Sequence, residues 1–239
     1  MNICSLLITA YQSADYILDT LESLHQQSLP ANWQIKFYIG VDSCNETASI
    51  LNKNSIPYYY SYNNVGTYVL TNSLIQKAKQ DNCDVFVRFD SDDIACENFL
   101  LYGIEHAVKN NFVSPYQILV DKDLNVINDN LKVAHGSMFA TRKAIDLLGG
   151  YYSYRVGCDT NFFRRANRLG LGGVITEKKP VYLYRQHTKS LMKNKQLGKG
   201  TNQRKQARDA MKKEFHSGVN RIETPITIDL KFRENKNDS

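Results

Sequence analysis

The chain has 239 residues, of which 42% are hydrophobic and 11% are aromatic. This length and composition suit one large α/β domain with a sizeable packed core, and they exclude wholesale disorder. The longest apolar runs, such as residues 3–10, are as short as a β-strand, so nothing in the sequence resembles a membrane-spanning helix.

The formal net charge of +6 is concentrated towards the C-terminus. Residues 1–187 carry 17 Lys and Arg against 18 Asp and Glu, whereas residues 188–239 carry 13 against 6. A solvated, partly flexible extension would have such a composition. The same charge would also suit contact with the phosphates of a donor, an anionic membrane surface or nucleic acid, and the sequence leaves these alternatives open.

The first half of the chain alternates predicted strands and helices. Short apolar runs predict strands over residues 3–9, 35–41, 57–62 and 84–89. Apolar residues at helical spacing predict helices over residues 16–24, through Ala48 and Leu51, and over residues 69–78. This alternation predicts a mainly parallel sheet covered by helices.

The second half is less regular. Helices are predicted over residues 97–109, 141–148 and 159–169, and strands over residues 116–120, 126–127 and 180–185. The basic extension is predicted to contain a helix over residues 199–216 and a last strand over residues 226–230, with a mobile connection near residues 194–204.

The N-terminus and the cysteines both favour a cytoplasmic protein. The first residues lack the basic segment and the long apolar stretch of a secretory signal. The five cysteines are odd in number, widely spaced and without a CxxC pair: Cys4, Cys44, Cys83, Cys96 and Cys158. That pattern fits reduced thiols better than disulfides or a zinc site.

Acidic side chains lie where two predicted strands end. Asp42 closes one strand, and Asp90, Asp92 and Asp93 directly follow another. Ligands of parallel sheets bind beyond the carboxyl ends of the strands, so these groups are expected to face one crevice. Three crowded carboxylates repel one another unless a cation or proton compensates, and Mg²⁺ or Mn²⁺ prefers such oxygen ligands. The alternative is that Asp93 caps the helix that follows.

Two further residues are candidates for chemistry. Asp159 begins a predicted helix, where a carboxylate either caps the helix or serves as a general base against an acceptor hydroxyl. His187 follows a predicted strand. A lone histidine is usually a satisfied or exposed side chain, and we interpret the other four in that way: His25, His106, His135 and His216.

Several segments, in order over about residues 3–190, together resemble family 2 glycosyltransferases with the GT-A fold. They are residues 5–11 (SLLITAY), 21–24 (LESL) with Gln27, 41–47 (VDSCNET), 64–66 (NVG) with Asn72, 87–93 (VRFDSDD), 136–139 (GSMF) with Arg142, 149–151 (GGY), 158–159 (CD) and 184–190 (YRQHTKS). Two departures stand out. The segment VDSCNET is shorter than the family's VDDGSxDxT and lacks one aspartate, and Cys158 replaces the glutamate of the family's Glu-Asp pair.

The resemblance implies a fold and a division of the chain. The fold is α/β, with a GT-A (Rossmann-like), mainly parallel central sheet flanked by helices. The glycosyltransferase domain would span residues 1–190, with a nucleotide-sugar-binding half at residues 1–93 and an acceptor-side half at residues 94–190. The basic C-terminal extension would follow at residues 191–239.

The resemblance also implies roles at the nucleotide-sugar site. Asp42 would bind the nucleobase, with Thr9 and Tyr11 lining the same pocket. The other residues implied to bind the nucleotide sugar are Ala10, Asn64, Gly66, Asn72, Arg88, Asp90, Ser91 and Asp92.

Metal and catalytic roles follow from the same comparison. Asp92 would contact Mn²⁺ or Mg²⁺, Asp90 would hold the ribose or the metal shell, and His187 would complete the coordination. Asp159 would be the general base.

The implied function is that of a metal-dependent, inverting glycosyltransferase in the cytoplasm. It would move a sugar from a nucleotide diphosphate, with UDP as the first candidate, to a hydroxyl of a glycan, a lipid-linked glycan or a modified nucleic acid. An anionic acceptor or surface would contact the basic extension. The sequence leaves the oligomeric state open.

Two rival functions remain at this stage. A nucleotidyltransferase also binds nucleotides through metal and carboxylates, although the chain lacks a glycine-rich Walker loop. A nucleic-acid-binding or DNA-modifying protein would use the basic extension, although residues 193–213 offer few aromatic side chains for base stacking.

Overall fold

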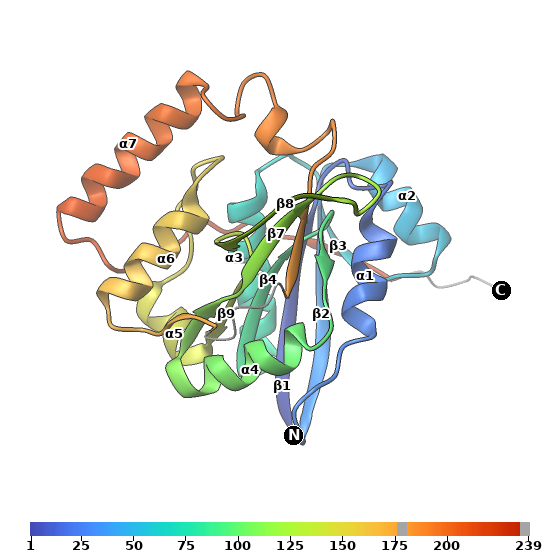
Figure 1. Cartoon of the computed structure of the whole chain (residues 1–239), viewed down its shortest axis with the longest axis horizontal. Coiled ribbons are helices and arrows are strands. Elements are labelled where there is room, and N and C mark those ends of the chain that lie inside the picture. Colours follow the sequence, from blue (N-terminus) through green and yellow to red (C-terminus); the bar gives the residue numbers. More distant parts are fainter. Residues whose placement is uncertain (176–180, 235–239) are drawn as a thin grey trace.

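A sheet of eight strands runs through the centre of the molecule (Figure 1). The computed structural model describes residues 1–175 and 181–234. The strands follow the order β10-β6-β9-β4-β1-β2-β3-β12. Their bounds are β1 (Asn2–Ala10), β2 (Trp33–Asp42), β3 (Tyr58–Ser61), β4 (Val85–Asp90), β6 (Phe112–Ser114), β9 (Met138–Thr141), β10 (Gly173–Val174) and β12 (Lys231–Arg233). β1 lies parallel to β2 and β4, β2 to β3, and β6 to β10, which confirms the mainly parallel sheet.

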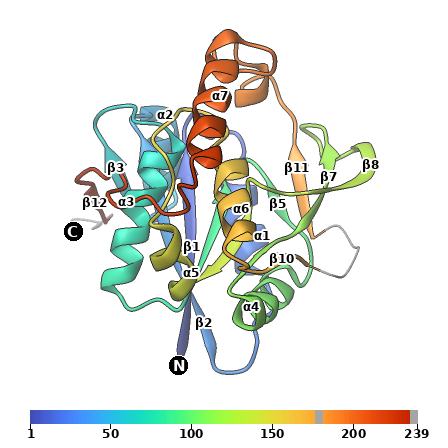
Figure 2. The same cartoon turned by 90° about the vertical axis from the view of Figure 1, so that its left-hand side faces the viewer.

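Helices cover both faces of this sheet (Figure 2). One face packs against α1 (Ile17–His25), α2 (Asn45–Lys53) and α4 (Phe99–Asn110). The other packs against α3 (Thr67–Gln80), α5 (Arg142–Leu148), α6 (Cys158–Arg168) and α7 (Asn202–His216). The central strands are rich in apolar residues because successive side chains point to opposite faces, and both faces are covered. In β4, for example, Val85, Val87 and Phe89 join the first core, whereas Phe86 joins the second.

A second, four-stranded sheet has the order β5-β11-β7-β8. It comprises β5 (Ile94–Ala95), β7 (Tyr116–Val120), β8 (Val126–Val133) and β11 (Tyr182–Arg185). β7 matches the strand predicted over residues 116–120, and its antiparallel partner β8 extends well beyond the predicted residues 126–127. β11 covers residues 182–185 of the strand predicted over residues 180–185. Residue 180 lies outside the described residues.

The prediction of a strand over residues 226–230 is wrong. Side chains of α3 bond the backbone of this segment instead: Asn72 donates to the Ile226 carbonyl, and the Ser73 hydroxyl accepts from Ile228 N–H. The strand β12 begins only at Lys231. Four short strands were also missed, namely β5, β6, β9 and β10, because two to four residues are too few to show a clear alternation.

The C-terminal extension follows a defined path around the domain. α7 packs on α6 with Met211 buried. Ile222 N–H then donates to the Leu148 carbonyl (3.0 Å), and β12 pairs with the edge strand β3. Most described residues along this path are exposed or half-buried, with Met211 of α7 buried.

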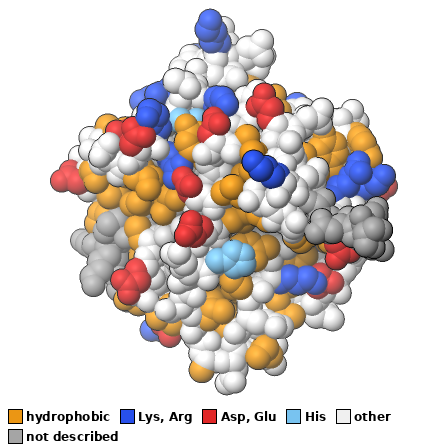
Figure 3. Space-filling view, turned by 90° about the vertical axis from the view of Figure 1, so that its right-hand side faces the viewer, with side chains coloured by type: hydrophobic (Ala, Val, Ile, Leu, Met, Phe, Trp, Pro, Cys, Tyr) orange, Lys and Arg blue, Asp and Glu red, His pale blue; other side chains and the backbone are white. Residues whose placement is uncertain are grey.

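The charges are unevenly spread over the surface. α7 exposes a group of cations that includes Lys205, Arg208, Lys212 and Lys213. On the side where α1 and α2 lie, acidic and basic side chains are intermixed (Figure 3). In the described part of the chain, no helix is both long and apolar enough to cross a membrane.

Candidate active site

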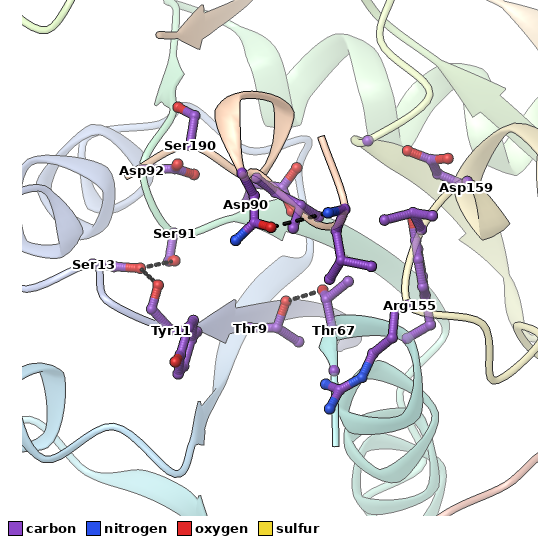
Figure 4. Close-up of a pocket in the computed structure, with 18 of the residues that line it drawn as sticks. Thr9, Tyr11, Ser13, Thr67, Asp90, Ser91, Asp92, Arg155, Asp159 and Ser190 are labelled. Carbon is purple, nitrogen blue, oxygen red and sulfur yellow. Dashed lines mark hydrogen bonds between the residues drawn. The ribbon is translucent and has the colours of Figure 1, made fainter. Parts of the chain in front are cut away.

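A cavity of about 710 Å³ opens at the carboxyl ends of the parallel strands. Its lining includes Thr9 of β1, Asp42 of β2 and Asp90 of β4, as the crevice rule for such sheets predicts. Asp159 of α6 lines the same cavity, on a different side from Asp92 (Figure 4). The tertiary structure thus brings together the carboxylates that the sequence analysis selected separately.

Asp42 shapes one end of the cavity by organising the loop before α3. Its carboxylate accepts hydrogen bonds from Val65 N–H and Gly66 N–H, both at 2.8 Å. Burial raises the pKa of Asp42, and the two backbone bonds oppose that rise. Gly66 has φ +88°, and a Cβ there would lie 2.9 Å from the Arg155 guanidinium, so the loop needs glycine.

Arg155 contributes to the same end of the cavity as Asp42. Its guanidinium donates to the Asn64 side-chain oxygen (2.5 Å) and to the Asn64 carbonyl (2.8 Å). These bonds join the loop before α3 to the loop before α6, two segments about 90 positions apart in the chain.

Two pairs of hydroxyl groups lie next to the strand ends (Figure 4). Thr9 Oγ1 is 2.6 Å from Thr67 Oγ1, and Ser13 Oγ is 2.6 Å from Ser91 Oγ. All four residues line the cavity, while Tyr11 stands at its rim with 51% of its surface exposed.

A buried guanidinium holds Asp90. Arg88 is only 3% exposed, and its Nη2 donates to Asp90 Oδ1 (2.6 Å) and to the Thr67 hydroxyl (3.3 Å). Arg88 Nη1 donates to the Gly136 carbonyl. Burial raises the pKa of Asp90 to about 6, opposed by Arg88 and reinforced by the charges of Asp92 and Asp159.

Asp92 and His187 form a close pair in the lining of the cavity. Asp92 Oδ2 lies 2.8 Å from His187 Nε2. His187 is 6% exposed, and its backbone N–H donates to Ser190 Oγ (3.1 Å). The centre of its ring lies 4.4 Å from the centre of the Tyr16 ring.

This donor set fits a hard divalent cation. The carboxylates of Asp92 and Asp90 are oxygen ligands of the kind that Mn²⁺ and Mg²⁺ prefer, and the imidazole of His187 lies beside Asp92. Among the residues that the structure describes, no group of three His, Cys, Asp or Glu side chains forms a complete ligand set. That is compatible with cations of this class, which commonly use one or two carboxylates and take further oxygens from substrate phosphates and water.

Asp93 does not cap a helix, so that alternative is wrong. α4 has Asn98 at its N-cap position without a side-chain cap bond. The fully buried Asp93 carboxylate instead accepts from the Tyr182 hydroxyl and from Arg185 N–H (2.7 Å). Asp93 thereby ties β11 to the acidic turn, and this tie positions His187, which follows β11.

Asp159 lies in the first turn of α6, where its oxygen accepts from Thr160 N–H (2.6 Å). The N-cap position itself belongs to Gly157, at φ +80° and without a side-chain bond. Cys158 is fully buried, and its thiol donates to the Tyr154 carbonyl (3.3 Å). The residue that replaces the family's glutamate therefore points into the core and leaves Asp159 as the acid of this pair.

Two of the residues implied to bind the nucleotide sugar, Ala10 and Asn72, lie outside the lining of this cavity. Ala10 is 1% exposed and packs in the core. Asn72 is also 1% exposed, and its amide exchanges two hydrogen bonds with Tyr151, both at 2.9 Å, besides its bond to Ile226. Asn72 is fully occupied in joining α3 to the loop after α5 and to the extension.

Several cavity residues were missed by the sequence analysis. Lys189 lies inside the segment YRQHTKS, which was the only available signal for it. No pattern marked the others, because they reach the cavity only through the fold: Ser13, Thr67, His135, Arg155 and Arg204. The segment between β11 and α7 passes over the strand ends and contributes Leu191, Asn194, Gln196 and Leu197 (Figure 1).

Comparisons with known proteins agree with this architecture. Residues 5–170 match the model of glycosyl transferase family 2. Among solved structures, S. aureus TarS 1-349 in complex with UDP is 17% identical with a TM-score of 0.59, and the match covers 79% of this chain and 61% of that one. The same fragment with UDP-GlcNAc is 15% identical with a TM-score of 0.59, covering 78% and 59%.

A third structure, titled S. aureus TarS, is 13% identical with a TM-score of 0.57 and is covered over only 38% of its length. The chain thus spans about three fifths of the TarS fragment, and at these identities the likeness shows the GT-A fold. A search of curated proteins found no match.

Proposed function

The chain belongs to glycosyl transferase family 2, and from that premise we propose that it is an inverting transferase that uses a nucleotide diphosphate sugar. The observation that carries the proposal is that Asp159 lines the same cavity as Asp90 and Asp92 (Figure 4). UDP is the first candidate nucleotide, supported by the UDP and UDP-GlcNAc complexes of TarS. The acceptor is a hydroxyl group.

The nucleotide of the donor occupies the end of the cavity near Asp42. There the loop organised by Asp42 and the guanidinium of Arg155 form one wall. Tyr11, exposed at the rim, offers an aromatic face for the base, and the Thr9 hydroxyl offers a hydrogen bond.

The diphosphate would lie beside Asp92 and His187, whose side chains are 2.8 Å apart and would hold Mn²⁺ or Mg²⁺ together with Asp90. When bound, the cation offsets the negative charge that grows on the departing diphosphate. Arg88 keeps Asp90 in place through their ion pair.

Asp159 acts on the acceptor. Its carboxylate takes the proton of the acceptor hydroxyl as that oxygen attacks the anomeric carbon, and the bond from that carbon to the diphosphate breaks. Because attack and departure occur on opposite faces in one displacement, the anomeric configuration inverts.

A donor screen tests the function. With Mn²⁺ present, we expect the protein to release nucleoside diphosphate from at least one UDP-sugar, and less or none from GDP- and TDP-sugars. Proton NMR of the transferred sugar is expected to show the opposite anomeric configuration to the donor. Release from no donor would refute glycosyl transfer, whereas retained configuration would refute only the direct displacement.

The C-terminal extension is proposed to close the cavity over the diphosphate. Gln203 and Arg204 line the cavity, and Arg204 Nε donates to the Leu197 carbonyl (2.8 Å). No described residue has a hydrogen bond or ion pair with its two terminal nitrogens, which leaves them available to a phosphate.

Two arginines on the same helix separate the possible roles of the extension. Arg204→Ala is expected to weaken donor binding about 10-fold, because one charge-assisted contact to phosphate is lost. Arg208→Ala is the matched control, since its side chain is 68% exposed and does not line the cavity. Calorimetry with UDP and Mn²⁺ measures both. An unchanged affinity for UDP together with salt-dependent loss of an anionic acceptor in both variants would make α7 an acceptor-binding surface instead.

A cytoplasmic location is also proposed. All five cysteines are unpaired in the structure, four of them buried, and this agrees with reduced thiols.

A further inference from the structure

His135 lines the same cavity as the proposed general base, Asp159. It precedes β9, lines the cavity with Gln117 of β7, and is half-buried. Its Nδ1 is 3.2 Å from Thr160 Oγ1, and Thr160 directly follows Asp159 on α6. Its ring packs on that of Phe163, 4.5 Å away. Contacts with α6 therefore fix the position of His135 relative to Asp159, which lies on the same helix as Thr160 and Phe163.

The imidazole is suited to a neutral hydrogen-bonding role. Burial lowers the pKa of His135, while the charge of Asp159 opposes this and that of Arg164 adds to it. In a neutral imidazole one nitrogen donates and the other accepts. Nδ1 is engaged with Thr160, and Nε2 has no hydrogen-bond partner among the described residues, so Nε2 is available to a ligand in the cavity.

We propose that His135 is an acceptor-binding residue whose Nε2 hydrogen bonds to one acceptor hydroxyl while Asp159 deprotonates the neighbouring one. The inference rests on the proposed function and narrows its acceptor. An acceptor that meets both groups carries at least two hydroxyls close together, as a sugar ring or a linear polyol does. A hydroxymethyl group on a nucleobase carries a single hydroxyl, so it does not supply the second hydroxyl that this proposal requires.

The neighbouring wall agrees with a neutral, polyhydroxylated acceptor. Gln117 adds an amide that both donates and accepts, and Val133 adds an apolar contact for the face of a ring. Arg88, a buried cation that lines the cavity, is committed to Asp90 and to the Gly136 carbonyl.

Two substitutions separate hydrogen bonding from packing. His135→Phe keeps an aromatic ring on Phe163 but removes both nitrogens, whereas His135→Gln restores a neutral donor and acceptor. The matched control is His25→Phe: its ring also packs 4.5 Å from a phenylalanine, Phe37, but it is exposed on α1 and lies outside the cavity lining.

The experiment uses the full chain with Mn²⁺, the UDP-sugar that the donor screen identifies, and a panel of acceptor probes. The panel contains methyl hexopyranosides, ribitol, and DNA carrying 5-hydroxymethylcytosine. We expect transfer to at least one polyhydroxylated probe. His135→Phe is then expected to raise the acceptor KM about 10-fold and to leave the donor KM within about twofold, whereas His135→Gln recovers most of the loss.

A deoxy version of that acceptor gives the sharpest readout. Removing the hydroxyl next to the glycosylated one is expected to cost the unchanged protein about 10-fold in kcat/KM and to cost His135→Phe nothing, because the same hydrogen bond is already missing. Transfer to the hydroxymethylcytosine DNA alone would overturn the proposal. An unchanged acceptor KM in His135→Phe would also overturn it. The same would hold if His135→Phe lowered kcat/KM equally for the full acceptor and for its deoxy version. If the unchanged protein consumes no donor with any acceptor or with water, the proposed function itself fails.

Discussion

Asp159→Asn is expected to slow sugar transfer by at least about 10²-fold while leaving donor and metal binding unchanged. Asparagine has nearly the same shape and retains an oxygen that accepts from Thr160 N–H, so the first turn of α6 keeps its hydrogen bond. It cannot take a proton from the acceptor. Single-turnover kinetics, with donor affinity from calorimetry, separate the chemical step from binding.

Asp129→Asn is the control for this experiment. Asp129 lies exposed on β8 and does not line the cavity, so the same chemical change there is expected to leave transfer unaffected. A well-folded Asp159→Asn protein with near-normal transfer would remove Asp159 from the mechanism. Its carboxylate would then serve only the N-terminus of α6, and His135 would become the nearest candidate base.

Asp92→Ala is expected to abolish the effect of Mn²⁺ on donor binding and to lower transfer by at least about 100-fold. The reason is that Asp92 and His187 are the two side chains that face each other as potential ligands, 2.8 Å apart. Calorimetry with UDP, with Mn²⁺ and with chelator, measures the first effect.

His187→Ala is expected to raise the Mn²⁺ concentration needed for half-maximal activity, because one of two ligands is lost.

Asp123→Ala serves as the control, since Asp123 is exposed in the turn between β7 and β8 and pairs only with the neighbouring Lys122. If the unchanged protein bound UDP equally well with Mn²⁺ and with chelator, the metal proposal would be wrong. Asp92 and His187 would then form a purely structural pair.

The parts of the site that local patterns predicted are those whose position follows from one strand and its end. Asp42 and Asp90 close buried apolar strands, and in a parallel sheet such ends meet at one edge. Their presence in one cavity was therefore predictable before any coordinate was known. The assignment of Asp93 was not, because its partners Tyr182 and Arg185 lie about 90 positions further along the chain.

Asn72 shows where the sequence does not reveal the hydrogen-bond partners of a polar side chain. Its place in a family-like segment implied donor binding, yet its amide bonds Tyr151 and Ile226, which approach it from two distant segments. A polar side chain in a helix gives no sign of whether its hydrogen bonds go to a ligand or to the backbone. Burial decides this, and the burial of a residue on α3 depends on the paths of the loop after α5 and of the extension.

By itself the sequence determined the alternation of strands and helices, the parallel centre of the sheet and the acidic strand ends, because hydrophobic periodicity and strand-end chemistry act over a few residues. The membership of the family followed from short segments in order. Only the tertiary structure decided that His135, Arg155 and Arg204 line the cavity, since each comes from a different loop or helix. Such positions result from the packing of segments that are far apart in the chain, and no local pattern encodes that packing.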